Sequence, residues 1–153
     1  MPKPYFSNKQ NKIEEIIRVD HAGEYGAKVI YEGQIKYTKD LSSKKLIKEM
    51  LEQELEHLEY FDQQIQDGRA RPTILMPVWK FFGYGLGAIS AKFGPKTAML
   101  VTENVEEVIV AHYQEQIDFL KQADPKNPLL KKIKKFQQDE AEHIHIAVSH
   151  DSK

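Results

Sequence analysis

The sequence predicts an all-α protein, an antiparallel four-helix bundle with an apolar crossover helix between the second and third long helices. Three observations support this prediction. Four long stretches carry apolar residues at the spacing of an α-helix. No run of alternating Val, Ile and Thr bounded by turns indicates a strand. Residues 67–94, which join the second and third helices, are too many for a tight turn. We expect residues 1–153 to form one domain.

The first predicted hairpin joins a helix from about Asn8 to Thr38 and a helix from about Ser43 to Gln66, with Ser42 as the N-cap of the second. The first helix carries one stripe of residues alternately four and three positions apart: Ile13, Ile17, Asp20, Glu24, Ala27, Tyr31, Gln34 and Thr38. The stripe of the second helix contains Ile47, Met50, Leu51, Leu58, Phe61 and Ile65.

The second predicted hairpin joins a helix from about Pro95 to Ala123 and a helix that follows the Asn127-Pro128 cap and reaches about Val148. The stripe of the third helix contains Met99, Thr102, Ile109, Tyr113, Ile117 and Leu120. That of the fourth contains Leu129, Ile133, Phe136 and Ala147.

Composition excludes several kinds of site. Lys and Arg number 22 and Asp and Glu 23, a net charge of −1, so bulk charge does not favour a nucleic acid partner. The absence of cysteine excludes disulfides, thiolate zinc sites, iron–sulfur clusters and cysteine nucleophiles. The first residues have neither an apolar signal core nor the pattern of an amphipathic presequence, so we expect no targeting segment.

Each predicted helix places ionisable side chains on its buried stripe, near mid-length. An isolated carboxylate in a dry core is costly and neutralises rather than staying charged. Residues three apart share a helix face, so each Glu-x-x-His motif aims a carboxylate and an imidazole at one point. Two helices with one Glu and two with Glu-x-x-His match the ligand set of a dinuclear metal site in a bundle. The candidate ligands are Glu24, Glu54, His57, Glu106, Glu140 and His143.

The spacing leaves three choices open. Glu103 shares a predicted face with Glu106, so periodicity alone does not choose between them. Carboxylate and imidazole ligands suit iron or manganese. A pair of such metals supports oxygen chemistry, iron oxidation and storage, or peroxide dismutation. The competing hypothesis is a metal-free bundle in which these side chains belong to solvated acidic faces.

The crossover, at about residues 72–94, is the one strongly apolar segment. From Thr73 to Ala91 it contains one charged residue, Lys80, but Pro77 and three glycines weaken a membrane-spanning helix. We expect a helix that lies in the membrane interface, the alternative being one packed on its own bundle or on a dimer partner. The residues expected to meet the membrane or a substrate tail are Leu75, Met76, Val78, Trp79, Phe81, Phe82 and Leu86.

Five blocks of the sequence together resemble the demethoxyubiquinone hydroxylase family, the di-iron monooxygenases of ubiquinone biosynthesis within the ferritin-like superfamily. The blocks are IIRVDHAGEYGA, EQELEHL, RPTILMPVW, NVEEVIVAHYQEQI and KKFQQDEAEHIHIAVSHD, in that order, and they cover nearly the whole chain. A ferritin would share the Glu-x-x-His logic but not the GEYGA block or the apolar crossover.

The resemblance implies roles for particular residues. It assigns the six candidate ligands named above to two iron ions and decides for Glu106 against Glu103 and Glu107. Tyr113 matches a tyrosine near the metals that the family implicates in substrate positioning or electron transfer. Asp139 and Asp20 are candidate outer acceptors for the N–H groups of ligand imidazoles.

The resemblance also implies an activity: O₂-dependent hydroxylation of a demethoxyubiquinol-type polyprenyl benzoquinol, with electrons from an external reductant. Expected partners are the quinol, the membrane surface, other ubiquinone-biosynthesis proteins and a second copy of the chain. The expected location is peripheral, on the cytoplasmic face of a bacterial inner membrane or the matrix face in mitochondria. Family members continue past the His150-Asp151 pair with an apolar helix; we expect metal binding to be independent of it, and membrane docking and pocket closure to depend on it. The alternative is a ferritin-like protein that oxidises, stores or detoxifies iron without an organic substrate.

Overall fold

The computed structural model describes residues 5–151 and is all-helical over that range. The predicted all-α bundle with a crossover helix is confirmed. The helix ends differ from the predicted ones by at most a few residues, as terminal turns usually do. The helices are α1 (Tyr5–Tyr37), α2 (Leu41–Gln66), α3 (Met76–Lys92), α4 (Pro95–Ala123) and α5 (Pro128–Asp151).

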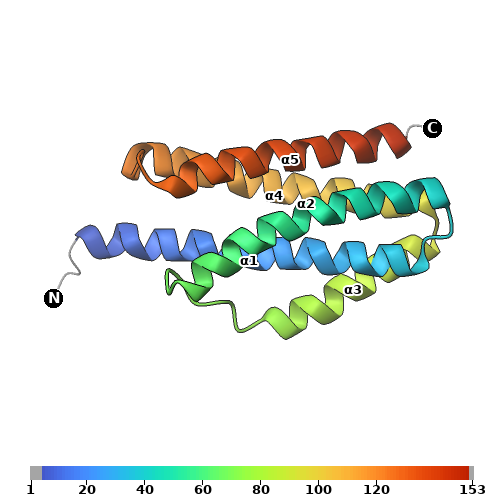
Figure 1. Cartoon of the computed structure of the whole chain (residues 1–153), viewed down its shortest axis with the longest axis horizontal. Helices are drawn as coiled ribbons and strands as arrows, with labels where there is room; N and C mark the ends of the chain where they lie inside the picture. The colour runs from blue at the N-terminus through green and yellow to red at the C-terminus, as the bar shows by residue number, and fades with distance from the viewer. Residues whose placement is uncertain (1–4, 152–153) are drawn as a thin grey trace.

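The four long helices form two hairpins, α1 with α2 and α4 with α5 (Figure 1). The hairpins contact each other through α1 and α4 and through α2 and α5. The crossover α3 packs along α1, with a smaller contact to α4, and lies on the side of the molecule away from α5 (Figure 1). Helix α3 is therefore a fifth, outer helix that packs mainly against α1, on the side of α1 that also faces α4.

The core follows the predicted stripes. All eight residues of the first predicted stripe are buried, seven in α1 and Thr38 directly after its end. Helices α2, α4 and α5 contribute fully buried apolar side chains such as Phe61, Leu120 and Ile133. Most apolar members of these stripes belong to one hydrophobic cluster. The six candidate ligands are buried ionisable side chains within this core, and Asp20 and His21 are buried as well.

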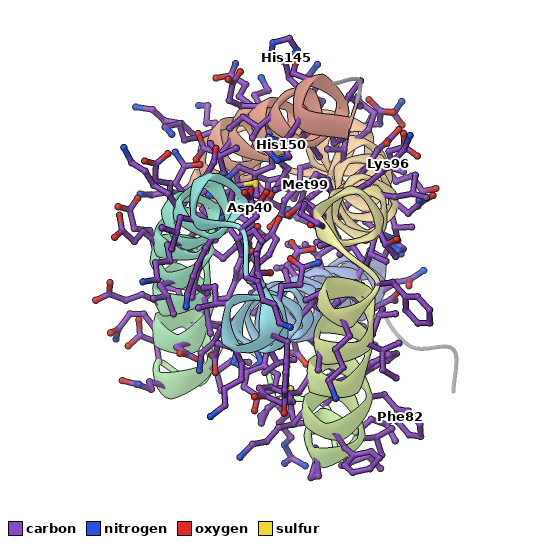
Figure 2. The ribbon with its side chains drawn as sticks, turned by 90° about the vertical axis from the view of Figure 1, so that its right-hand side faces the viewer. Asp40, Phe82, Lys96, Met99, His145 and His150 are labelled. Atoms are coloured by element: carbon purple, nitrogen blue, oxygen red, sulfur yellow. The ribbon has the colours of Figure 1, made fainter. Side chains whose placement is uncertain are left out.

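The predicted N-cap of α2 was wrong. Helix α2 begins at Leu41, and its cap is Asp40, whose carboxylate accepts a hydrogen bond from the Ser43 backbone N–H at 2.9 Å. A carboxylate at this position also meets the positive end of the helix dipole, which explains why Asp40 replaces Ser42 in the role. The Ser43 hydroxyl lies 2.7 Å from Nε2 of His150, so the same turn contacts the far end of α5 (Figure 2).

Glycines allow α3 to approach α1 at backbone distance. A Cβ atom on Gly87 would lie 2.0 Å from the carbonyl oxygen of Ile30, and one on Gly33 would lie 2.4 Å from that of Tyr84. The crossover is thus packed on its own bundle, which was the alternative to a helix that lies in the membrane interface. Its other face is exposed: Ile74, Phe81 and Phe93 are 93%, 75% and 76% accessible. Across residues 5–151, every helix is too short or too polar to cross a bilayer.

Candidate metal centre and its apolar pocket

The six candidate ligands converge at the centre of the bundle. Glu24 comes from α1, Glu106 from α4, and the two Glu-x-x-His pairs from α2 and α5. The four carboxylates are fully buried, and both histidines are 1% accessible. On α4 the helix register buries Glu106 and leaves Glu107 exposed, with Glu103 half-buried. Side chains separated by up to 119 positions in the sequence (143 − 24) therefore meet at one place.

The six side chains divide into two groups that share two members. In one group, oxygen or nitrogen atoms of Glu24, His57, Glu54 and Glu140 all lie within 4.8 Å of one another. In the other, atoms of Glu106, His143, Glu54 and Glu140 do so. Each group thus has one Glu and one His of its own, Glu24 with His57 and Glu106 with His143, and both groups contain the carboxylates of Glu54 and Glu140. The arrangement fits two adjacent cations, which the two shared carboxylates, Glu54 and Glu140, would help to hold.

The hydrogen bonding of the cluster fits a cation. Five of its carboxylate oxygens are buried and lack a hydrogen-bond donor among the described residues, including both oxygens of Glu54. Unpaired buried polar atoms are costly, and carboxylate oxygens without donors are suited to a positive ion. The donor set of oxygen and imidazole nitrogen, without sulfur, favours iron or manganese among the metals that proteins bind.

The pKa values of Glu54, His57 and Glu140 are raised in the metal-free cluster, so bound protons balance part of the negative charge that metal ions would otherwise balance. Burial, followed by the charges of Glu106 and Glu24, raises the pKa of Glu140 to about 8. Burial, followed by the same kind of repulsion, raises the pKa of Glu54 well above its usual value. Burial disfavours the charged form of His57, but the adjacent carboxylates of Glu140 and Glu24 outweigh that effect and raise its pKa to about 11. Divalent ions would displace these protons.

Two buried tyrosines donate hydrogen bonds to Glu24 and Glu106, the glutamates that belong to one group each, and both bonds join α1 and α4. The Tyr113 hydroxyl of α4 donates to Oε1 of Glu24, and the Tyr31 hydroxyl of α1 donates to Oε1 of Glu106. The sequence interpretation named Tyr113 as a site residue and placed Tyr31 only in the core. The signal was available, because Tyr31 follows Glu24 by seven residues, as Tyr113 follows Glu106.

The Nε2 atom of each histidine, which points away from the carboxylate cluster, lies at hydrogen-bond distance from a side-chain oxygen of a residue outside the six candidate ligands. His57 Nε2 lies 2.9 Å from Oδ2 of Asp139, the position expected for this residue. His143 Nε2 lies 2.6 Å from Oε1 of Gln53, which the sequence interpretation missed although Gln53 precedes Glu54 as Asp139 precedes Glu140.

The expectation for Asp20 was wrong about its partner. Asp20 is buried on α1, one turn before Glu24, but it accepts a hydrogen bond from Nε2 of Gln116 at 2.7 Å rather than from a ligand imidazole. Gln116 occupies the α4 position that faces this turn of α1. Burial raises the pKa of Asp20 well above its usual value; the hydrogen bond from Gln116 lowers it but does not cancel that effect, and the charge of Glu24 raises it further.

An apolar pocket of about 480 Å³ lies between α1, α3 and α4. Leu75, Trp79, Phe82 and Leu86 line its crossover side, and Val105 and Ile109 line its α4 side, together with His112. A second, small cavity of about 20 Å³ shares Val19, Gly23, Ile109 and His112 with this pocket and is also lined by Glu24 and Tyr113. The pocket therefore adjoins the carboxylate cluster on the Glu24 side.

The remaining crossover residues take other positions. Val78 and Phe81 are exposed and do not line the pocket, and Met76 is half-buried. Phe82 is 65% accessible and projects away from the neighbouring helices (Figure 2), so it lies at the rim rather than the floor of the pocket. The crossover thus has one face toward the pocket and one toward solvent.

Comparisons with known proteins identify relatives over nearly the whole chain. The model of the family "Ubiquinone biosynthesis protein COQ7" matches residues 11–153. The "NADPH-dependent 3-demethoxyubiquinone 3-hydroxylase, mitochondrial" of Dictyostelium discoideum is 49% identical over 146 residues, 95% of this chain and 67% of the relative. The human protein of that name is 45% identical over 143 residues, 92% of this chain and 66% of the relative.

A bacterial relative has a similar name. The "3-demethoxyubiquinol 3-hydroxylase" of Rhodospirillum rubrum is 41% identical over 142 residues, 92% of this chain and 66% of the relative. The chain spans about two thirds of the length of these relatives. Since the match extends from α1 to α5 and includes every candidate ligand, the chain belongs to the ubiquinone biosynthesis protein COQ7 family.

Proposed function

We propose that this chain is a di-iron monooxygenase that hydroxylates a demethoxyubiquinol-type polyprenyl benzoquinol with O₂ in ubiquinone biosynthesis. The observation that supports this most directly is the apolar pocket beside the buried carboxylate and histidine cluster. A volume of about 480 Å³ lies within the usual range for small-molecule pockets. The names of the relatives supply the substrate class.

The six converging side chains would hold the two iron ions. Glu24 and His57 would bind one ion, Glu106 and His143 the other, and Glu54 and Glu140 both. Four carboxylates and two neutral imidazoles carry the charge of −4 that two divalent ions neutralise. Bound iron would supply the electrons that activate O₂, which the protein's own side chains cannot provide.

The side chains of the pocket would bind the quinol and exclude water. Leu86 and Ile109 offer the apolar contacts that a benzoquinol ring and its isoprenoid tail require. His112 brings a polar group to the pocket wall. The Tyr113 hydroxyl donates a hydrogen bond to Oε1 of Glu24, where the small cavity reaches the cluster. A ring that enters from the pocket would therefore approach the metals from the Glu24 side.

The overall reaction consumes one O₂, two electrons and two protons. One oxygen atom forms the new C–O bond of the ring as a hydroxyl group, and the other leaves as water. The names of the Dictyostelium discoideum and human relatives include NADPH dependence, and that of the Rhodospirillum rubrum relative does not. The two names support NADPH as the source of the two electrons.

The exposed apolar side chains of the crossover segment, in α3 and at its two ends, support delivery of the substrate from a membrane. Ile74, Phe81 and Phe93 lie on the crossover segment that also forms one wall of the pocket. A helix with such side chains can lie in the membrane interface and pass a polyprenyl tail into the bundle. Liposome flotation tests this: the protein should float with vesicles, and replacing Phe81 and Phe93 by Ser should reduce the floating fraction. A homodimer and complexes with other biosynthetic proteins stay predictions.

Activity is tested with the reduced, iron-loaded chain, O₂ and a short-chain demethoxyquinol. The expected product is heavier by one oxygen atom, and ¹⁸O₂ should label it. Unlabelled product, or none from a protein that contains two irons, would contradict the proposal. The iron-storage alternative requires a hollow oligomer and has no use for the apolar pocket; assembly into such an oligomer without lipid binding would favour it.

A further inference from the structure

The two candidate ligand histidines are held in the same way but by different acceptors. Each turns Nδ1 toward the carboxylates: His57 Nδ1 lies 2.9 Å from Glu140, and His143 Nδ1 lies 3.0 Å from it. Each turns Nε2 toward the opposite helix, to Asp139 at 2.9 Å and to Gln53 at 2.6 Å.

Asp139 and Gln53 are equivalent positions in the two halves of the bundle. Each is the residue immediately before the Glu of a Glu-x-x-His motif, and each reaches the histidine of the other motif. The halves therefore match in geometry and differ in charge. The acceptor of His57 is a carboxylate, and that of His143 is a neutral amide.

The carboxylate is itself fixed in place. Both oxygens of Asp139 accept from the Lys135 ammonium group, at 2.7 and 2.9 Å, and its side chain is only 17% accessible. An imidazole whose N–H donates to a carboxylate is a more basic metal ligand than one whose N–H donates to an amide.

We propose that Asp139 and Gln53 make the two metal positions unequal, so that the position of His57 binds a divalent ion more tightly than the position of His143. This inference rests on the proposed function, because it requires a bound metal pair. Both residues act through a histidine and are positioning residues. The ion beside His57 is then the one better stabilised in its oxidised state.

The test is titration of the full metal-free chain with Co²⁺ under anaerobic conditions, followed by the visible absorbance of the bound ion. The wild-type chain should bind two ions in separable steps. Asp139→Asn should weaken the tighter step about 10- to 100-fold. Gln53→Glu should strengthen the weaker step. Each variant thus brings the two dissociation constants closer together, Asp139→Asn by weakening the tighter step and Gln53→Glu by strengthening the weaker one. The double variant should separate the two dissociation constants again.

A second readout is the Mössbauer spectrum of the chain loaded with ⁵⁷Fe²⁺. Two distinct quadrupole doublets are expected in the wild type, converging in either single variant. The matched controls are Glu142→Gln and Gln138→Glu, which make the same charge changes at exposed positions of α5 and should leave both readouts unaltered.

The outcomes separate this inference from the proposed function. The inference would be overturned if the chain binds two ions but each variant changes the affinity of both steps equally, or if Gln53→Glu weakens the second step. Either outcome would leave the proposed metal pair intact. A chain that binds no metal would overturn both.

Discussion

The contact between α1 and α3 makes a sharp prediction for Gly87. In Gly87→Ala the new Cβ would lie 2.0 Å from the carbonyl oxygen of Ile30 and 2.8 Å from its carbonyl carbon. Both atoms are backbone, so no side-chain rotation relieves the clash. With a contact distance of about 3.5 Å, the helices must separate by about 1.5 Å. Forcing extra volume into a packed interface costs about 1–3 kcal/mol.

Gly85→Ala is the matched control, because no atom lies within 4 Å of its added Cβ. Both glycines lie inside α3 without positive φ, so both variants gain the same helix propensity, about 0.5–1 kcal/mol. The difference between the two variants therefore isolates the packing cost of about 1–3 kcal/mol.

Urea unfolding of both variants measures this difference as a shift in midpoint at constant slope. Because α3 forms one wall of the pocket, Gly87→Ala should also raise KM for a demethoxyquinol while iron content stays at the wild-type level. Equal midpoints for the two variants would refute the backbone contact between α1 and α3.

Three further predictions concern the cluster. Glu106→Ala should abolish activity and lower iron content measured by elemental analysis, whereas the exposed Glu107→Ala should spare both; equal losses would mean that the α4 register is wrong. Tyr31→Phe removes the donor to Glu106 and should lower metal affinity by about 10-fold in a competition titration, with unchanged helix content by circular dichroism. The folded-state pKa values of Glu140 and His57, about 8 and about 11, exceed their ordinary values of 4.5 and 6.5. The metal-free chain should therefore lose the contribution of Glu140 to its stability as pH rises from 4.5 to about 8, and that of His57 as pH rises from 6.5 to about 11. Calorimetry checks this, and a Tm that rises over these ranges would contradict the pKa directions.

Helical periodicity determined most of the fold. The stripe from Ile13 to Thr38 is buried in the structure as predicted, because a long amphipathic helix has only one face to bury. The burial of Glu24 and Glu106 followed from the same periodicity, although that periodicity did not separate Glu106 from Glu103. The paired Glu-x-x-His motifs indicated convergence, since side chains three apart share a helix face.

Only the tertiary structure decided which residues meet across helices. The hydrogen bonds of Tyr31 with Glu106 and of Gln53 with His143 depend on the rotation of one helix against another, which no local pattern specifies. The hydrogen bond of Asp20 with Gln116 depends on helix packing in the same way. So does the pocket, one wall of which is α3, the helix that Gly87 allows to pack closely against α1. Periodicity selects the face that a helix buries; packing selects the atoms that this face contacts.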